Sequence, residues 1–229
     1  MADKVADAHY QTVERIWDTA RPVHHDMSPA FFARIVDEMQ PEIRAGSGRR
    51  LLDVGCGMGN LMGVLKARGF DCHGFDFAQA KVDAAQQDNP GRVWKQSFLD
   101  PYQQAPFDYV ISYSVLQYCR PVDMPVVLLR TVEALKIGGQ ALHMAVPVME
   151  RFEQANGAHY NAQNEAELTA HRRRFMVGAM ESQPVNDDGT FFHSGEKMME
   201  IVSGFGHEVR MFQTGNSKYR MTFEIIRKH

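Results

Sequence analysis

Short apolar runs alternate with segments of helical periodicity between residues 49 and 146. This alternation predicts a parallel β-sheet whose strands are joined by crossover helices. The expected strands cover residues 50–54, 70–75, 92–96, 107–112 and 141–146, and the expected helices cover 61–69, 78–87 and 122–136. Glycines at 138 and 139 are expected to end the last of these helices. The pattern therefore predicts an α/β fold with a doubly wound sheet.

The two flanks of this segment have a different character. Two amphipathic helices are expected before the first strand, over residues 8–19 and 29–43. Residues 148–193 are polar with a helical tendency, which is typical of an insertion at one edge of a sheet. A helix at 195–203 and strands at 207–213 and 219–227 complete the chain. Because a short turn joins these strands, they are expected to form an antiparallel hairpin.

Composition narrows the class of protein. The chain has 229 residues, of which 44% are hydrophobic and 23% are charged, as in an ordinary globular domain. A formal net charge of -3 gives no general attraction to nucleic acid or to an anionic membrane. The N-terminus has neither the basic start nor the apolar run of a secretory signal, so a cytoplasmic location is expected.

Cysteine usage gives no sign of a metal site. Cys56, Cys72 and Cys119 are odd in number and form no Cys-x-x-Cys pair. This argues against a disulfide framework and against structural zinc. We therefore expect no bound metal.

A glycine-rich turn after the first strand carries the clearest chemical signal. The sequence Asp53-Val-Gly55-Cys-Gly57-Met-Gly59 ends a strand and opens a helix. Glycines allow close approach of a ligand to the backbone, and the helix N-terminus offers free N–H groups. A dinucleotide fingerprint would place its third glycine at position 60, which is Asn60 here. The spacing instead fits Asp-x-Gly-x-Gly-x-Gly.

With this spacing the chain resembles the class I S-adenosylmethionine-dependent methyltransferases of the small-molecule type. Three further segments agree in the expected order: Asp76 at the end of the second strand, the fourth strand at 107–111, and the turn at 135–139, where Ile137 replaces the usual proline. The resemblance implies a mostly parallel, seven-stranded, Rossmann-like sheet with a C-terminal antiparallel hairpin. It divides one domain into a helical N-terminal cap (1–48), a cofactor-binding core (49–146), a substrate-lid insertion (147–193) and a C-terminal helix with the hairpin (194–229).

The same resemblance implies S-adenosyl-L-methionine as cofactor, with S-adenosyl-L-homocysteine as product. Asp53 would orient the glycine loop and the cofactor's amino group, and Asp76 would bind both ribose hydroxyls. Phe77 and Phe98 would enclose the adenine, although aromatic residues here also suit a plain core. The expected cofactor-binding residues are Trp17, Asp53, Gly55, Cys56, Gly57, Gly59, Asp76, Phe77, Ser97, Phe98, Ser112 and Tyr113.

Candidates for the acceptor side are less specific. Gln117 and Tyr118 occupy positions where many relatives carry an acid and a histidine, so the obvious base is missing. The expected substrate-binding residues are His24, His25, Gln117, Tyr118, Arg172, Arg173 and Arg174. The arginine cluster would select an anionic acceptor, yet a charge run is more often a solvated helix face. The candidate catalytic residues are His159, Tyr160 and His193.

The expected function is methyl transfer to an oxygen or nitrogen atom of a small molecule, anionic or linked to a sugar or nucleotide. A nicotinamide-dependent oxidoreductase would use the same strand order and Asp76, but this chain lacks the glycine that such an enzyme needs at position 60. A catalytically inactive cofactor-binding scaffold is a second alternative. The acidic balance counts against nucleic-acid methylation and membrane partners. The cap and the final hairpin are surfaces that could pair two copies in a homodimer.

Overall fold

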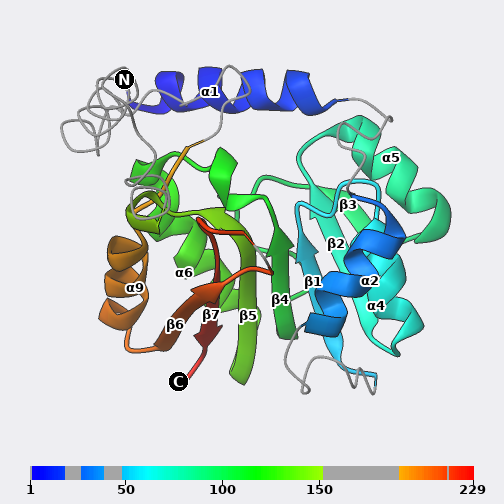
Figure 1. Ribbon diagram of the computed structural model, residues 1–229. Coiled ribbons are helices and arrows are strands. Elements are labelled where there is room, and N and C mark those ends of the chain that lie inside the picture. The colour runs from blue at the N-terminus through cyan, green and yellow to red at the C-terminus, as the bar shows by residue number, and fades with distance from the viewer. Residues whose placement is uncertain (1, 19–26, 39–47, 152–190, 216) are drawn as a thin grey trace.

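The computed structural model describes residues 2–18, 27–38, 48–151, 191–215 and 217–229. A seven-stranded sheet in the order β3-β2-β1-β4-β5-β7-β6 forms its centre (Figure 1). The strands are β1 (Arg50–Val54), β2 (Asp71–Asp76), β3 (Val93–Lys95), β4 (Phe107–Tyr113), β5 (Leu135–Pro147), β6 (Glu208–Gln213) and β7 (Arg220–Ile226). Strands β3, β2, β1, β4 and β5 are parallel, whereas β7 and β6 are antiparallel to their neighbours. The predicted sheet and its C-terminal hairpin are confirmed.

Helices cover both faces of this sheet and also the side where the parallel strands end. They are α1 (Ala2–Trp17), α2 (Pro29–Glu38), α4 (Asn60–Ala67), α5 (Gln79–Asp88), α6 (Met124–Ala134) and α9 (Gly195–Gly204), with short 3-10 turns η1 (Leu116–Tyr118) and η2 (Pro121–Asp123). Helices α2, α4 and α5 share one hydrophobic cluster, and α6 and α9 share the other. Helix α1 lies across the edge toward which the parallel strands point (Figure 1).

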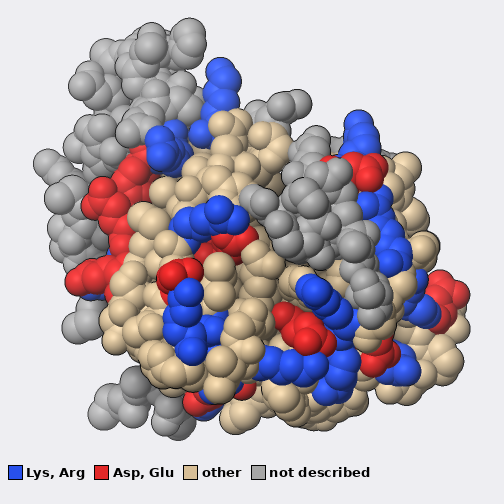
Figure 2. Space-filling model, turned by 90° about the horizontal axis from the view of Figure 1, so that it is seen from below, with Lys and Arg blue, Asp and Glu red and all other residues tan. Residues whose placement is uncertain are grey.

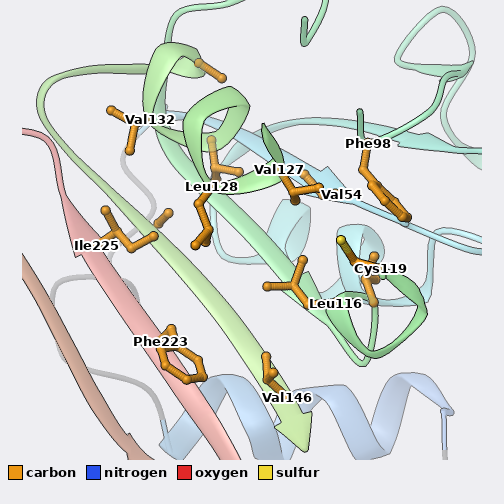
Figure 3. Close-up of a cluster of buried hydrophobic side chains, with 14 of the residues drawn as sticks. Val54, Phe98, Leu116, Cys119, Val127, Leu128, Val132, Val146, Phe223 and Ile225 are labelled. Atoms are coloured by element: carbon orange, nitrogen blue, oxygen red, sulfur yellow. The ribbon is translucent and has the colours of Figure 1, made fainter. Parts of the chain in front are cut away.

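Strand alternation sends neighbouring side chains to opposite faces of the sheet. Leu51 in β1 packs with α2, α4 and α5, whereas Leu52 packs with α6 and α9. Figure 3 shows the second cluster, where Leu128 of α6 lies on the side of Ile225 of β7, and Phe223 lies further along the same strand toward Val146. Both faces are thus buried, which explains the continuous apolar runs in the sequence.

Local signals begin two of the helices. Pro29 stands at the first position of α2, and the Oγ of Ser28 accepts a hydrogen bond from the Phe31 N–H at 3.2 Å. Ser194 caps α9 in the same way, accepting from the Lys197 N–H at 3.3 Å. These caps satisfy N–H groups that have no partner inside the helix.

The start of β5 differs from the prediction. Helix α6 ends at Ala134, and β5 begins directly at Leu135 instead of at residue 141. Gly138 (φ +76°) and Gly139 therefore lie inside the strand. The Gly138 N–H donates to the Arg227 carbonyl at 2.8 Å, so pairing with the end of β7 holds this segment extended. Such pairing involves residues far apart in sequence, which a local helix-ending signal does not record.

The face opposite α1 carries charges of both signs, as Figure 2 shows. Lys136 pairs with Asp108 at 2.8 Å, and Arg92 pairs with Asp71 at 2.5 Å. This mixture differs from the continuous basic stripe of a nucleic-acid-binding surface. In the described ranges, no helix is long and apolar enough to cross a membrane.

Candidate functional site

A cavity of about 400 Å³ lies at the carboxyl ends of the parallel strands. In open α/β sheets this edge, next to the point where strand order reverses, is where ligands bind. Helices α1 and α2 supply part of its wall, and the loops after β1, β2 and β4 supply most of the rest. Its lining comprises Trp17, Met27, Phe31, Phe32, Asp53, Gly55, Cys56, Gly57, Met58, Asn60, Leu61, Asp76, Phe77, Lys81, Phe98, Tyr113, Ser114, Val115, Gln117, Tyr118 and Arg220.

The glycine loop between β1 and α4 forms the floor of the cavity. Gly55, Gly57 and Gly59 have φ angles of +67°, +54° and +82°, in the left-handed region that favours glycine. A Cβ on Gly55 would lie 2.5 Å from Cγ2 of Val115, whereas a Cβ on Gly57 would meet no atom within 4 Å. The loop is therefore packed against Val115, just after β4, at Gly55 and is open at Gly57.

Asp76 ties this loop to the end of β2. Its Oδ2 accepts a hydrogen bond from the Gly57 N–H at 2.9 Å, and its Oδ1 accepts from the Ala78 N–H at 3.0 Å. Burial raises the pKa of Asp76, and the two backbone bonds oppose that rise. Each carboxylate oxygen has a second lone pair, so Asp76 can still accept bonds from a ligand's hydroxyl groups.

Asp53 is the second buried carboxyl group of the cavity. It is 2% exposed, and its Oδ2 has no hydrogen-bond partner among the described residues. Burial raises the pKa of Asp53 well above its usual range, and the nearby Asp76 carboxylate adds to the rise. An isolated buried acceptor is costly unless a donor satisfies it. A ligand with an N–H group would supply that donor.

Aromatic side chains enclose the remaining walls. Phe77 and Phe98 line the cavity on the β2 and β3 side. Tyr118 packs edge-to-face on Trp17, with ring centroids 5.4 Å apart. Such apolar walls suit a planar base, which stacks without strict hydrogen-bond requirements.

Helix α1 closes the cavity from above by contacts on both of its sides. Tyr10 donates a hydrogen bond to Oδ2 of Asp123, the last residue of η2, at 2.6 Å. At the other end, Asp18 Oδ1 accepts from the Ala80 N–H in α5 at 2.8 Å. Trp17 at the end of α1 thereby lines the same cavity as the glycine loop. The last residues of α1 thus form part of the cavity wall.

Several expected site residues lie in this cavity, and others do not. The lining includes nine of the predicted cofactor residues and both described substrate candidates, namely Trp17, Asp53, Gly55, Cys56, Gly57, Asp76, Phe77, Phe98 and Tyr113 with Gln117 and Tyr118. Gly59 is instead the N-cap residue that precedes α4. Ser97 lines an adjacent cavity of about 170 Å³. Ser112 is fully buried, and its Oγ lies 2.8 Å from Nδ1 of His143.

His193 is also placed away from the cavity lining. It is 3% exposed, and its Nε2 lies 2.8 Å from the carbonyl oxygen of Leu116. Burial lowers the pKa of His193 to about 4. This environment favours a structural role over that of a general base. The remaining candidates, His24, His25, His159, Tyr160, Arg172, Arg173 and Arg174, lie outside the described residues.

Sequence reasoning missed residues that only tertiary contacts bring to the cavity. Lys81 of α5 is 5% exposed beside Asp76, and burial lowers the pKa of its ammonium group. Phe31 and Phe32 come from the first turn of α2. Arg220 arrives from the first residue of β7. No local motif marks these positions. Within the described ranges, no cluster of His, Cys, Asp or Glu is arranged to hold a metal ion.

Comparison with known proteins supports the same reading of the fold. A family described as "Methyltransferase domain" matches residues 23–183, which is more than half of the chain. A curated relative, the biotin biosynthesis bifunctional protein BioHC of Cellvibrio japonicus, is 34% identical over 95 residues. That match covers 40% of this chain but only 18% of the bifunctional protein.

Solved structures share the architecture at low sequence identity. Magnesium protoporphyrin IX methyltransferase of Synechocystis PCC 6803, with bound SAH, is 16% identical with a TM-score of 0.60, over 98% of this chain and 97% of that one. The sugar N-methyltransferase KedS8 of a Streptoalloteichus species is 16% identical with a TM-score of 0.60, over 91% and 90% of the two chains. At this identity the likeness concerns the fold alone. Together with the family match, the glycine loop and the strand order show that the chain belongs to the methyltransferase-domain family, with the class I fold of S-adenosylmethionine-dependent methyltransferases.

Proposed function

We propose that this protein transfers a methyl group from S-adenosylmethionine to an oxygen or nitrogen atom of a small molecule. The observation that carries the proposal is the arrangement of the two buried carboxyl groups around the open glycine loop. Asp53 and Asp76 lie at the ends of neighbouring strands and line the cavity, and a Cβ on Gly57, which also lines it, would meet no atom within 4 Å. Family membership supports the same reaction class.

The residues present fit this cofactor. The unpartnered Oδ2 of Asp53 needs a hydrogen-bond donor, and the cofactor's ammonium group offers one. Asp76 retains acceptor capacity for two ribose hydroxyls. Phe77 and Phe98 provide the apolar walls that an adenine requires. A cavity of about 400 Å³ falls within the size range of ligand sites.

The residues of this chain would act chiefly by alignment and exclusion of water. Bound S-adenosylmethionine supplies an electrophilic methyl carbon on a sulfonium. Trp17 and Tyr118 cover the cavity, which keeps the acceptor in line and dehydrates the site. An amine acceptor needs only to arrive deprotonated, whereas a hydroxyl group benefits from a base. For that base we retain His159 and Tyr160 as candidates outside the described residues.

Two alternative functions make different predictions from the proposed methyl transfer. A nicotinamide-dependent oxidoreductase would also use Asp76, but Asn60 stands where its glycine is expected, and the Asn60 side chain donates to the Met27 carbonyl at 2.9 Å. An inactive scaffold would bind the cofactor without turnover. Calorimetric titration with S-adenosylhomocysteine and with NADH distinguishes the methyltransferase from the oxidoreductase. Transfer of label from radioactive S-adenosylmethionine into a metabolite extract distinguishes the methyltransferase from the inactive scaffold.

The proposal predicts that Asp76→Ala weakens binding of S-adenosylhomocysteine by about ten- to hundredfold, because charge-assisted hydrogen bonds to the ribose are lost. Isothermal calorimetry measures this affinity, and circular dichroism checks that the variant is folded. Asp83→Ala, an exposed acid on α5, serves as the matched control and should bind normally. Unchanged affinity in the folded Asp76→Ala variant would contradict the assigned role.

A further inference from the structure

Arg220 brings a cationic group to the end of the cavity farthest from β2. It is the first residue of β7, and it pairs with Pro147 at the end of β5. Because β7 is antiparallel to β5, its first residue lies at the carboxyl edge of the parallel strands. Three strand steps separate β7 from β1, which corresponds to about 14 Å across the sheet. Arg220 therefore lies on the side away from the proposed adenosine site.

One nitrogen of the Arg220 guanidinium makes all of its hydrogen bonds. Nη1 donates to Gln117 Oε1 at 2.7 Å, to the Ala145 carbonyl at 2.9 Å and to Ser114 Oγ at 3.4 Å. All three acceptors are neutral. Within the described part of the chain, no carboxylate forms an ion pair with Arg220, and neither Nε nor Nη2 has a hydrogen-bond partner. Arg220 lines the cavity, and two of its guanidinium nitrogens thus have no hydrogen-bond partner among the described residues.

The backbone around this arginine is held in an uncommon conformation. Ser114 and Ala145 have φ angles of +55° and +57°, which non-glycine residues seldom adopt. Both supply an oxygen to the same Nη1 atom. The pairing of β5 with β7 also shifts register between His143 and Val146, as at a β-bulge. Bulges and left-handed residues of this kind concentrate next to functional sites, where they re-aim a group.

The neighbouring polar atoms are also donors. Since Gln117 Oε1 accepts from Arg220, the Gln117 amide nitrogen is left to donate, and it has no partner among the described residues. The Ser114 hydroxyl accepts from Nη1, so its proton is available as well. Aromatic rings fill the adjacent wall: Phe31 lies 5.5 Å and Phe32 5.4 Å from Tyr113, measured between ring centroids. The local chemistry therefore favours an anion attached to an apolar body.

We propose that Arg220, with Gln117 and Ser114, binds a carboxylate of the methyl acceptor. A guanidinium presents two parallel N–H groups that match the two oxygens of a carboxylate. The proposal rests on the proposed methyltransferase function, and it names an acidic small molecule with an apolar or aromatic body as the acceptor class. Arg220 is a specificity-determining residue in this assignment, and it holds the acceptor without taking part in bond formation.

A matched pair of ligands tests the assignment. Benzoate and benzamide have the same shape and differ in charge, and both are titrated into free and S-adenosylhomocysteine-loaded protein by ligand-observed NMR. We expect benzoate to bind at least about tenfold more tightly than benzamide in the unaltered protein. Arg220→Met should abolish that preference, and Arg220→Lys should keep part of it, because a lysine retains the charge but not the fork. Arg130→Met, an arginine of α6 outside the cavity lining, should leave the preference unchanged.

Several results would overturn the assignment. Absent benzoate binding, equal binding of benzoate and benzamide, or a preference that survives in a folded Arg220→Met variant each exclude the carboxylate site. A tenfold or larger loss of S-adenosylhomocysteine affinity in Arg220→Met would instead mean that Arg220 binds the carboxylate of the cofactor itself. Failure of the unaltered protein to bind S-adenosylhomocysteine would remove the proposed function, while benzoate titration of the free protein still decides the anion site. Arg220→Lys provides the readout if Arg220→Met does not fold.

Discussion

At the scale of single residues, Asp53 and Asp76 end neighbouring strands but have different surroundings. Asp76 accepts two backbone hydrogen bonds, so its negative charge is partly compensated in the ligand-free protein. Asp53 is equally buried, yet its Oδ2 accepts none from the described residues. The free protein therefore carries an electrostatic cost at Asp53 that a bound ammonium group would relieve.

This difference predicts opposite effects of Asp53→Asn on stability and on binding. Replacing this buried ionisable carboxyl group with a neutral amide should raise the free energy of unfolding of the ligand-free protein by about 1–3 kcal/mol near pH 8, while it weakens S-adenosylhomocysteine binding. The folded-state pKa of Asp53 is raised, so its charge destabilises the fold as the pH rises through that value. The gain in Asp53→Asn should therefore shrink as the pH is lowered.

Urea unfolding between pH 5 and pH 8 measures this gain, and calorimetry measures the binding loss. Asp88→Asn at the exposed end of α5 is the control and should show neither effect. A loss of stability in Asp53→Asn that is the same at every pH would contradict the electrostatic explanation.

At the scale of elements, the glycines of the β1–α4 loop have different roles: one is packed inside the protein and another borders the cavity. Gly55 is enclosed by Val115, whereas the space above Gly57 is open. Both have positive φ, so an alanine at either position bears a backbone cost of about 1–2 kcal/mol. Only their surroundings differ.

We expect Gly55→Ala to lower the thermal stability strongly, because the new methyl group would overlap Cγ2 of Val115. Gly57→Ala should lower the stability only by the backbone cost. It should bind S-adenosylhomocysteine poorly, because its methyl group enters the cavity. Gly63→Ala in the middle of α4 has open space and ordinary φ, so it should gain up to about 1 kcal/mol. Thermal melts with and without ligand distinguish the three variants. Equal stability of the Gly55 and Gly57 variants would contradict this account.

At the scale of the whole molecule, two buried histidines form contacts between the sheet and the segments that join its strands. His143 in β5 is fully buried between Ser112 and Thr131, whose hydroxyl oxygens lie 2.8 and 3.1 Å from its two ring nitrogens. His193 contacts the Leu116 carbonyl in η1. Burial lowers the pKa of each histidine to about 4. Both are therefore neutral in the folded protein near neutral pH.

These two histidines should consequently lower the stability of the fold as the pH falls from about 6.5 toward 4, because at these sites the unfolded chain binds protons that the folded chain does not. Each histidine adds a slope of at most about 1.4 kcal/mol per pH unit. Urea unfolding at several pH values should show a shallower slope in His143→Gln. His229→Gln, at the exposed chain end, should change the slope less, because His229 acts only through the neighbouring His207, whose pKa is lowered by burial and by the His229 ring. An unchanged slope in His143→Gln would mean that His143 is protonated in the folded state.

Much of the fold was predictable because it depends on local patterns. The bounds of β1 and the existence of all seven strands follow from apolar runs and their punctuation by glycine. The start of β5 was missed because pairing with β7 overrode the helix-ending signal at Gly138 and Gly139. Local preference gave way there to long-range hydrogen bonding.

The sequence by itself determined the proposed cofactor side of the cavity, since Asp53, the glycines and Asp76 lie within 24 residues that one β-α-β unit brings together. Tertiary structure alone decided the opposite side. Ser114, Ala145 and Arg220 are far apart in the chain, and they meet only because β7 inserts antiparallel beside β5. It also decided that His193 is buried. The physical reason is that spacing along a chain fixes contacts within one unit, whereas contacts between distant strands depend on how the whole sheet is assembled.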